Sequence, residues 1–157
     1  RKRHTIKAAK NSILIFLENA LSVITRKYVN ALGEDYKHGT GHGVGHILSV
    51  HEGPQFISPK GAGQEMLARM ITSNEPGIYI EGEYGIRLEN EILCIKNGDH
   101  LEFETITLCP FDKEAICFDE LSDDELLWLK NYHQKVYDVL SPHLDENPRQ
   151  WLKEQLI

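Results

Sequence analysis

Hydrophobic residues between positions 12 and 29 recur at three- and four-residue steps, the period of an amphipathic helix. Asn11 or Ser12 can cap this helix, and it is expected to end before Gly33. Three later apolar runs, each bounded by turn residues, predict strands of a mostly antiparallel sheet: 66–72, 91–95 and 101–108. The Gly- and Pro-rich segment 38–63 predicts loops around one short strand, 47–50.

The C-terminal third has a helical pattern. Ser122 and Glu125 form a capping box, a start signal for a helix. Apolar positions then follow at helical spacing along one face, up to the break before Pro142: Leu126, Leu129, Tyr132, Val136, Val139 and Leu140. Asn147 and Pro148 predict a short final helix, with the proline at its first position. The patterns together predict an α+β chain with a helical C-terminal segment.

Composition narrows the class of protein. The 157 residues are 41% hydrophobic and 26% charged, with a formal charge of −7, which is typical of one soluble domain or two small ones. No run of 18 apolar residues and no signal-type cleavage site is found, so neither a membrane span nor secretion is expected. Cys94, Cys109 and Cys117 lie among apolar neighbours without a Cys-x-x-Cys pair, which favours buried thiols in a reducing, cytoplasmic setting.

The positive charge is concentrated at one end. The first ten residues carry five Lys and Arg side chains, so the remaining 147 residues sum to −12. A basic tip of this kind can contact nucleic acid, and a nucleic-acid or chromatin accessory is one alternative function. The acidic body argues against it, because it would repel phosphate.

Candidate chemistry lies in the middle of the chain. His38, His42, His46 and His51 fall within fourteen residues, interleaved with four glycines. Imidazole can bind a metal or move a proton near neutral pH, and glycine allows the backbone to approach a ligand closely. An exposed loop with incidental histidines has the same composition, so this segment alone leaves both interpretations open.

Two glutamates extend the candidate site. Glu75 directly follows an apolar run, and Arg87 and Glu89 share one face if their segment is extended. One imidazole with two carboxylates suits manganese, cobalt or zinc better than a thiolate-bound structural metal. Either glutamate taken singly is more often a solvated surface charge.

Four blocks resemble aminopeptidase P, in the same order and at compatible spacing: Tyr-Lys-His-Gly-Thr-Gly-His-Gly-Val-Gly at 36–45, Val-His-Glu-Gly-Pro at 50–54, Asn-Glu-Pro-Gly-Ile-Tyr at 74–79 and Gly-Ile-Arg-Leu-Glu-Asn at 85–90. The resemblance implies half of a pita-bread fold over residues 26–110, with a mostly antiparallel sheet and covering helices. Residues 111–157 then correspond to the helical C-terminal extension of the long, cytosolic forms. Residues 1–25 are not covered by it.

The resemblance implies a metallo-exopeptidase that releases the N-terminal residue before a proline, by means of metal-activated water. His42, Glu75 and Glu89 match metal ligands of the family, and Glu75 would also take a proton from the bridging water. Manganese is the expected metal, two ions in the complete site, with cobalt or zinc as alternatives. Proline-containing peptides are the expected substrates, and the C-terminal helices imply a homodimer in the cytoplasm.

Other residues match the substrate site of that family. His38 and His51 match histidines that line it, and His51 would hydrogen-bond the scissile carbonyl or the developing oxyanion. Arg87 matches an arginine that positions the site, and Tyr79 matches a tyrosine beside it that contacts substrate. His46 matches no functional position, so we expect it to face solvent or to pack.

The resemblance also exposes a difference. The family has two further aspartate ligands before the long helix, whereas the only acids before His38 are Glu18, Glu34 and Asp35, none in a matching context. We therefore expect one metal or none here, and reduced or no activity from this chain alone. The alternative is a catalytically silent pita-bread module that binds peptides or proteins. The intact ligand positions favour the enzyme.

Overall fold

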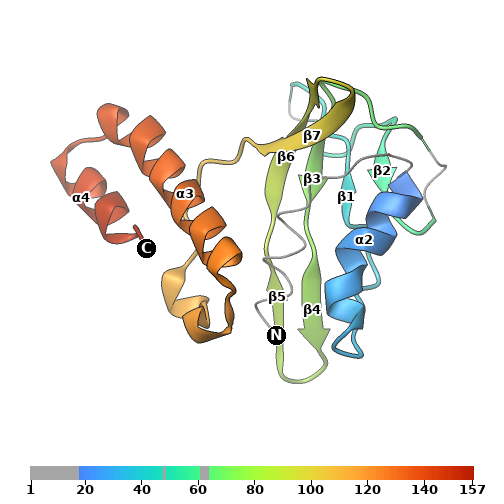
Figure 1. The fold of residues 1–157 in the computed structure, drawn as a ribbon, viewed down its shortest axis with the longest axis horizontal. Coiled ribbons are helices and arrows are strands. Elements are labelled where there is room, and N and C mark those ends of the chain that lie inside the picture. The colour runs from blue at the N-terminus through green and yellow to red at the C-terminus, as the bar shows by residue number, and fades with distance from the viewer. Residues whose placement is uncertain (1–17, 48, 61–63) are drawn as a thin grey trace. The chain divides into compact units, whose positions relative to one another are not determined.

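The computed structural model describes residues 18–47, 49–60 and 64–157 (Figure 1). Its contacts divide the chain between Thr107 and Leu108 into two compact units, which are described separately. No helix in the described part of the chain is both long and apolar enough to cross a membrane.

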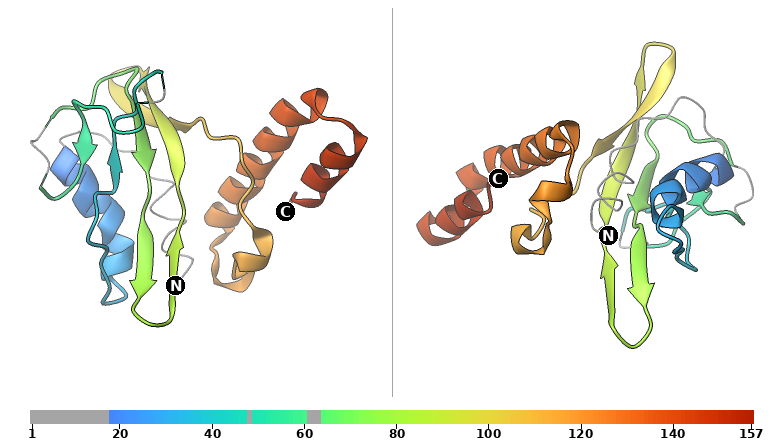
Figure 2. Two further views of the ribbon diagram at one scale, coloured as in Figure 1. Left: turned by 180° about the vertical axis from the view of Figure 1, so that it is seen from behind. Right: turned by 60° about the horizontal axis from the view of Figure 1, so that its bottom comes forward.

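The N-terminal unit contains one described helix and seven short strands. These are α2 (Glu18–Asn30), β1 (Gly41–His42), β2 (Phe56–Ile57), β3 (Ile71–Asn74), β4 (Gly77–Ile80), β5 (Tyr84–Arg87), β6 (Asn90–Asn97) and β7 (His100–Thr105). Strands β3, β6 and β7 form an antiparallel sheet, β4 and β5 form a hairpin, and β1 pairs with β2. A bridge between Gly43 and Thr72 holds β1 beside β3. Figures 1 and 2 show α2 next to the β1–β2 pair.

The predicted first helix ends as expected, because α2 stops at Asn30 and Gly33 follows with a φ of 77°. Its predicted cap, Asn11 or Ser12, lies outside the described residues. The helix packs through two small clusters of buried side chains, one with Leu21, Ile57 and Met66, the other with Val29, Tyr36 and Ile78. Each such aliphatic side chain contributes about 1.5–3 kcal/mol by leaving water, which fixes α2 against the strands.

The predicted strand 47–50 is wrong for its described residues. Ile47 has a φ of 59°, which an extended strand does not allow, and the Gly45 N–H donates to the Ser49 carbonyl at 2.9 Å, closing a turn. The run 66–72 is a strand only from Ile71, since a turn with Arg69 at φ 79° precedes it. Residues 91–95 lie within β6, whereas 101–108 is extended only as far as Thr105.

The hairpin β4–β5 was not predicted. Glycines at 77, 82 and 85 obscure its apolar alternation. Its turn places Gly82 at a φ of 76°, a conformation that glycine adopts without strain. The hairpin matters for the site because it joins the segments that carry Glu75 and Glu89.

The C-terminal unit is helical, with α3 (Asp123–Leu140) and α4 (Glu146–Glu154) as its main elements and η1 (Lys113–Ala115), η2 (Phe118–Glu120) and η3 (Ser141–His143) as short 3-10 turns. The predicted capping box at Ser122 is formed, and the Ser122 N–H donates to Glu125 Oε2 at 2.8 Å. Tyr132 and Val136 pack with Leu152 of α4 as its core.

Three details of this unit differ from expectation. Val139 is 43% exposed, because the buried stripe of α3 runs through His133 and Val136 instead. Helix α4 begins at Glu146 after Asp145, so Pro148 is its third residue. Cys109 and Cys117 are exposed and only Cys94 is buried, so the cysteines are not uniformly core residues.

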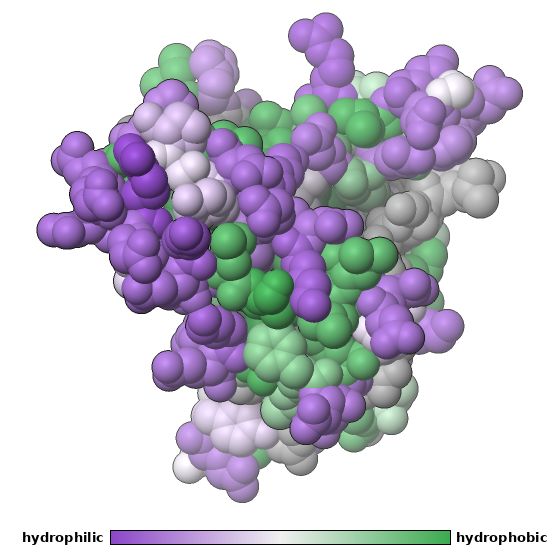
Figure 3. All heavy atoms as spheres, turned by 60° about the vertical axis from the view of Figure 1, so that its left-hand side comes forward, coloured by the Kyte–Doolittle hydropathy of each residue, from purple (hydrophilic) through white to green (hydrophobic). Residues whose placement is uncertain are grey.

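Figure 3 shows one face of the molecule, covered mostly by hydrophilic residues with hydrophobic ones between them.

Candidate metal and peptide-binding site

Two neighbouring strands bring His42 and Glu75 together. His42 ends β1, and Glu75 follows β3 directly, as predicted from the sequence. The Glu75 N–H donates to the Thr40 carbonyl at 2.8 Å, which joins the two segments. This approach requires glycine at position 41, since a Cβ there would lie 1.8 Å from the Ser73 carbonyl oxygen.

The orientation of His42 is set by its backbone neighbour. Its Nδ1 lies 3.1 Å from the Gly43 carbonyl oxygen, which only accepts, so Nδ1 carries the proton. In the neutral ring, Nε2 then carries no proton, and its lone pair faces Glu75 Oε1, with 3.3 Å between the two atoms. A lone pair opposite a carboxylate oxygen is an arrangement that a shared cation stabilises, and a carbonyl-bound Nδ1–H is usual for a metal-binding histidine.

Ser73 links these two side chains and was missed in the sequence. Its hydroxyl donates to Glu75 Oε1 at 3.0 Å and accepts the His42 backbone N–H at 3.0 Å. It is also buried, with 2% of its surface exposed. The signal that could have found it is the period of two along a strand, which places residues 73 and 75 on the same side.

Arg87 bridges the two predicted carboxylates. Its Nη1 lies 3.5 Å from Glu75 Oε2, and its Nη2 lies 3.0 Å from Glu89 Oε2. The Glu75 side chain is only 12% exposed, whereas that of Glu89 is 41% exposed. Arg87 ends β5, and Glu89 lies between β5 and β6 rather than within a strand. The guanidinium therefore offsets about half of the negative charge that the two glutamates concentrate here, and one negative charge remains.

A divalent cation fits part of this arrangement. The chemistry of the donors suits it, and His42 with Glu75 already converge. Over residues 18–47, 49–60 and 64–157, however, no group of three or more His, Cys, Asp or Glu side chains is close enough to hold a metal. The structure thus brings together two of the three predicted ligands, while Glu89 contacts Arg87.

The other predicted histidines flank this pair. The rings of His51 and His42 have centroids 4.2 Å apart, and His51 is exposed. His38 Nδ1 donates to the Gly39 carbonyl at 2.7 Å, so in the neutral ring Nε2 accepts the Tyr79 hydroxyl at 2.8 Å. His46 is exposed, in agreement with its expected orientation toward solvent.

Tyr79 lies flat on the hairpin. A Cβ at Gly77 would lie 2.5 Å from its hydroxyl oxygen, and one at Gly85 would lie 2.9 Å from its ring. Gly77 pairs with Arg87 in the hairpin register, so the hydroxyl points toward the strand position that carries the arginine. Tyr79 and His38 therefore occupy the same face of the hairpin as Arg87, beside the His42–Glu75 pair.

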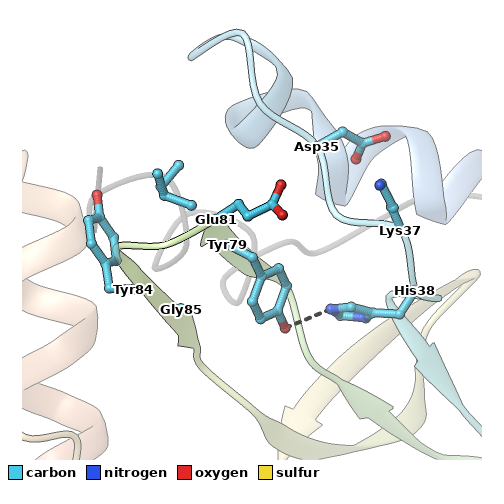
Figure 4. A pocket seen from close by; sticks show the side chains of 8 residues that line it. Asp35, Lys37, His38, Tyr79, Glu81, Tyr84 and Gly85 are labelled. Atoms are coloured by element: carbon cyan, nitrogen blue, oxygen red, sulfur yellow. Dashed lines mark hydrogen bonds between the residues drawn. The ribbon is translucent and has the colours of Figure 1, made fainter.

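A cavity of about 760 Å³ opens beside this tyrosine (Figure 4). It is large enough for a few residues of a peptide. In Figure 4 the His38 and Tyr79 side chains meet at one end of it, with Lys37 and Asp35 near His38, and Tyr84 stands at the opposite end. Its lining consists of Asp35, Lys37, His38, Tyr79, Ile80, Glu81, Tyr84 and Gly85.

Comparisons with known proteins identify the family of the chain. The model of "Metallopeptidase family M24" matches residues 6–96, and that of the "C-terminal region of peptidase_M24" matches residues 99–156. The chain is 41% identical over 146 residues to aminopeptidase P1 of Lotus japonicus, and 45% identical over 136 residues to a probable Xaa-Pro aminopeptidase P of Coprinopsis cinerea. These matches cover 87% and 78% of the chain but 22% of each relative. The chain thus spans about a fifth of their length.

Solved structures confirm the expected α+β fold of the pita-bread type. An X-prolyl aminopeptidase from Caenorhabditis elegans, described as a cytosolic enzyme with a di-nuclear active site, superposes with a TM-score of 0.88 at 32% identity, over 99% of this chain and 27% of that one. Prolidase from Pyrococcus furiosus superposes with a TM-score of 0.54 at 28% identity, over 64% of this chain and 28% of that one. The resemblance to the C-terminal part of a long-form aminopeptidase P is therefore confirmed, and the chain belongs to metallopeptidase family M24.

Proposed function

We propose that this chain contributes to a proline-specific aminopeptidase site, which releases the N-terminal residue of a peptide whose second residue is proline. The observation that supports this most directly is His42 Nε2 facing Glu75 Oε1 at 3.3 Å, with Arg87 at the other oxygen of the carboxylate. The family and the printed activities of the relatives supply the reaction class.

The metal ligands in this proposal are His42, Glu75 and Glu89. A bound divalent metal, with manganese the expected ion, polarises the scissile carbonyl and makes water a nucleophile at neutral pH. Glu75 holds the proton released by that water, because its carboxylate is more buried than that of Glu89. Arg87 moderates the charge of both carboxylates before the metal binds.

The remaining side chains orient the peptide. His51 donates a hydrogen bond to the carbonyl oxygen, which carries negative charge as the water attacks. His38 and Tyr79 stand beside the residue that follows the scissile bond, and the cavity of about 760 Å³ next to them takes the downstream peptide. The ring contact between His51 and His42 supports the first assignment, and the hydrogen bond between His38 and Tyr79 at the edge of the cavity supports the second.

We further propose that this chain alone holds at most one metal and turns over slowly or not at all. The described residues bring two donors together rather than five, and Glu89 must leave Arg87 before it can join them. A second metal would then lack anionic ligands to compensate its charge. Donors from elsewhere in a longer protein, or from a second copy in a homodimer, would complete the site.

The test is metal analysis of the purified chain together with hydrolysis of a Xaa-Pro-Xaa tripeptide, with and without added manganese. We expect no more than one manganese per chain, and its loss in a His42→Ala variant. His46→Ala is the matched control, since this exposed histidine lies four residues away and has no assigned role. Unchanged metal binding in His42→Ala would show that the ligand is assigned wrongly. Two metals per chain with turnover would show that the site needs no further donors.

A second candidate function is a silent module that binds peptides without cleaving them. The salt bridges of Arg87 favour it, because they give both carboxylates a cationic partner without a metal. Binding of the tripeptide in the presence of a chelator would support this candidate. Binding that needs manganese would support the enzyme.

The cellular location and the oligomeric state of the protein are also proposed. The C. elegans neighbour is described as cytosolic, and we place this chain in the cytoplasm as well. A homodimer is proposed from the helical C-terminal unit, which corresponds to the extension of the long forms, and sedimentation of the purified chain measures the oligomeric state directly.

A further inference from the structure

Arg26 is a buried arginine on α2 that faces the segment carrying His38. Only 5% of its surface is exposed. Its Nη1 donates to Asp35 Oδ1 at 2.5 Å and to the Tyr36 carbonyl at 2.5 Å, and its Nη2 donates to the His38 carbonyl. The guanidinium also lies 4.0 Å from the centroid of the Tyr36 ring. One side chain of α2 therefore contacts three of the four residues from 35 to 38.

These contacts go mainly to backbone carbonyls, and the one charged partner, Asp35, matters less. The Asp35 side chain is 57% exposed, and ion pairs with exposed carboxylates contribute little to stability. Two of the acceptors are carbonyls at positions 36 and 38, which a planar fork with several fixed donors can hold at once. The ammonium of a lysine has no such fork. The geometry thus points to a role in setting the path of the chain.

The path of residues 36–38 determines where the His38 ring lies. Its centroid is 4.9 Å from that of Tyr36, the same ring on which Arg26 stacks. From there the imidazole reaches the Tyr79 hydroxyl across the site at 2.8 Å. A shift of the His38 carbonyl would therefore move the ring away from Tyr79, because the other hydrogen bond of the imidazole in the described part of the chain goes to the Gly39 carbonyl, which would shift with it.

A second set of contacts ties α2 to the same segment. Thr25 Oγ1 lies 3.1 Å from Thr40 Oγ1, and the Tyr36 hydroxyl lies 2.8 Å from that same oxygen. Burial raises the pKa of the Tyr36 phenol, so its O–H remains available to this network. The Thr40 carbonyl in turn accepts the Glu75 N–H. Helix α2 thus holds both ends of the segment that leads from His38 toward the metal ligands.

We propose that Arg26 is a positioning residue of the peptide site: its guanidinium holds the backbone at Tyr36 and His38, and so places the His38 imidazole against Tyr79. The role of His38 in peptide binding rests on the proposed function, whereas the positioning of its ring does not. Arg26 itself touches neither substrate nor metal.

The decisive measurement is the nitrogen NMR spectrum of the histidine side chains in the full chain. Arg26→Lys keeps the charge and removes the fork, and Arg26→Met removes both. We expect the His38 resonances to shift or broaden in both variants, while those of His100 and His133 stay in place. Lys27→Met is the matched control, because it removes the exposed cation next along the same helix. Circular dichroism confirms that each variant is folded, and Arg26→Lys carries the test if Arg26→Met does not fold.

Affinity for a Xaa-Pro-Xaa tripeptide, measured with manganese present, gives a second readout. We expect it to fall roughly 3- to 10-fold in Arg26→Lys, about the value of one hydrogen bond, and to be unchanged in Lys27→Met. Unmoved His38 resonances in a folded Arg26→Lys variant would overturn the inference. If the unaltered chain binds no peptide, the proposed function fails, and the His38 resonances still decide whether Arg26 positions that ring.

Discussion

Replacement of His133 by phenylalanine tests the hydrogen bonds that hold the C-terminal unit together. His133 lies on α3 and is 2% exposed. Its Nδ1 donates to the Gln155 carbonyl at 2.7 Å, and its Nε2 accepts the Phe111 N–H at 3.1 Å. One imidazole thus joins the start of the unit and the end of α4 to the central helix. Phenylalanine keeps the ring and removes both bonds.

The expected cost follows from the two groups that lose their partner. A buried donor or acceptor left without a hydrogen bond costs about 1–3 kcal/mol. Phe111 and Gln155 are partly buried, so the lower part of that range applies to each group, and His133→Phe should destabilise the unit by about 2–4 kcal/mol. A domain has about 0.05–0.15 kcal/mol of stability per residue, so this is a large part of what residues 108–157 can have.

The pH dependence separates this explanation from a simple loss of packing. Burial lowers the pKa of His133 below its usual value of 6.5, and the nearby Lys113 ammonium lowers it further. The unfolded chain then binds the proton more readily than the folded one, so the stability from this residue is complete above about pH 6.5 and decreases as the pH falls below it. The phenylalanine variant should lack this part of the pH dependence.

Urea unfolding followed by tryptophan fluorescence measures both effects, because Trp128 and Trp151, the two tryptophans of the chain, lie in this unit. With a slope of about 1 kcal/mol/M for so small a unit, the midpoint at pH 7.5 should fall by about 2 M or more. His143→Phe, at an exposed position, should change the free energy of unfolding by no more than about 0.5 kcal/mol. Equal midpoints for His133→Phe and the unaltered chain at pH 7.5, or an equal loss of stability between pH 7.5 and 5, would refute the reasoning.

Three further predictions concern the site and a helix start. Gly41→Ala should lower the stability by at least about 1–3 kcal/mol in calorimetry, because its Cβ would meet the Ser73 carbonyl oxygen at 1.8 Å. Gly39→Ala should cost less, because its nearest neighbour would be the Phe56 ring at 3.0 Å, and equal costs would contradict this. Ser73→Ala should weaken manganese binding about tenfold in titration calorimetry without unfolding the chain, and an unchanged affinity would exclude Ser73 from the site. Ser122→Ala should lower the stability of the C-terminal unit by about 1 kcal/mol in thermal unfolding, and no change would show that the capping box contributes nothing.

Local signals account for the parts of the fold that could be predicted. The start of α3 depends on Ser122 and Glu125, three residues apart, and the turn after β6 depends on Gly98 at a φ of 58°. Such contacts form between neighbours in the chain and are visible in the sequence. The wrong strand at 47–50 shows the limit of this reasoning, because the left-handed backbone of Ile47 has no signal in its side chain.

In the candidate site, too, some residues could be predicted from the sequence and others could not. The residue types and spacing of His42, Glu75 and Glu89 are legible in the motifs, as is the family they belong to. Ser73 and Arg26 carry no motif, because the backbone groups that they bind, the His42 N–H and the His38 carbonyl, come within their reach only after folding.

The amino-acid sequence was therefore enough to assign the family and the helical end of the chain, since each depends on residue types at fixed spacing. Tertiary structure decided which ligands meet: it set His42 against Glu75, because glycine at 41 lets β1 approach β3, and it held Glu89 on Arg87 instead. It also brought the Arg26 guanidinium into contact with the His38 carbonyl. These arrangements depend on the packing of strands and helix against one another, and hydrophobic burial and register, rather than spacing along the chain, determine that packing.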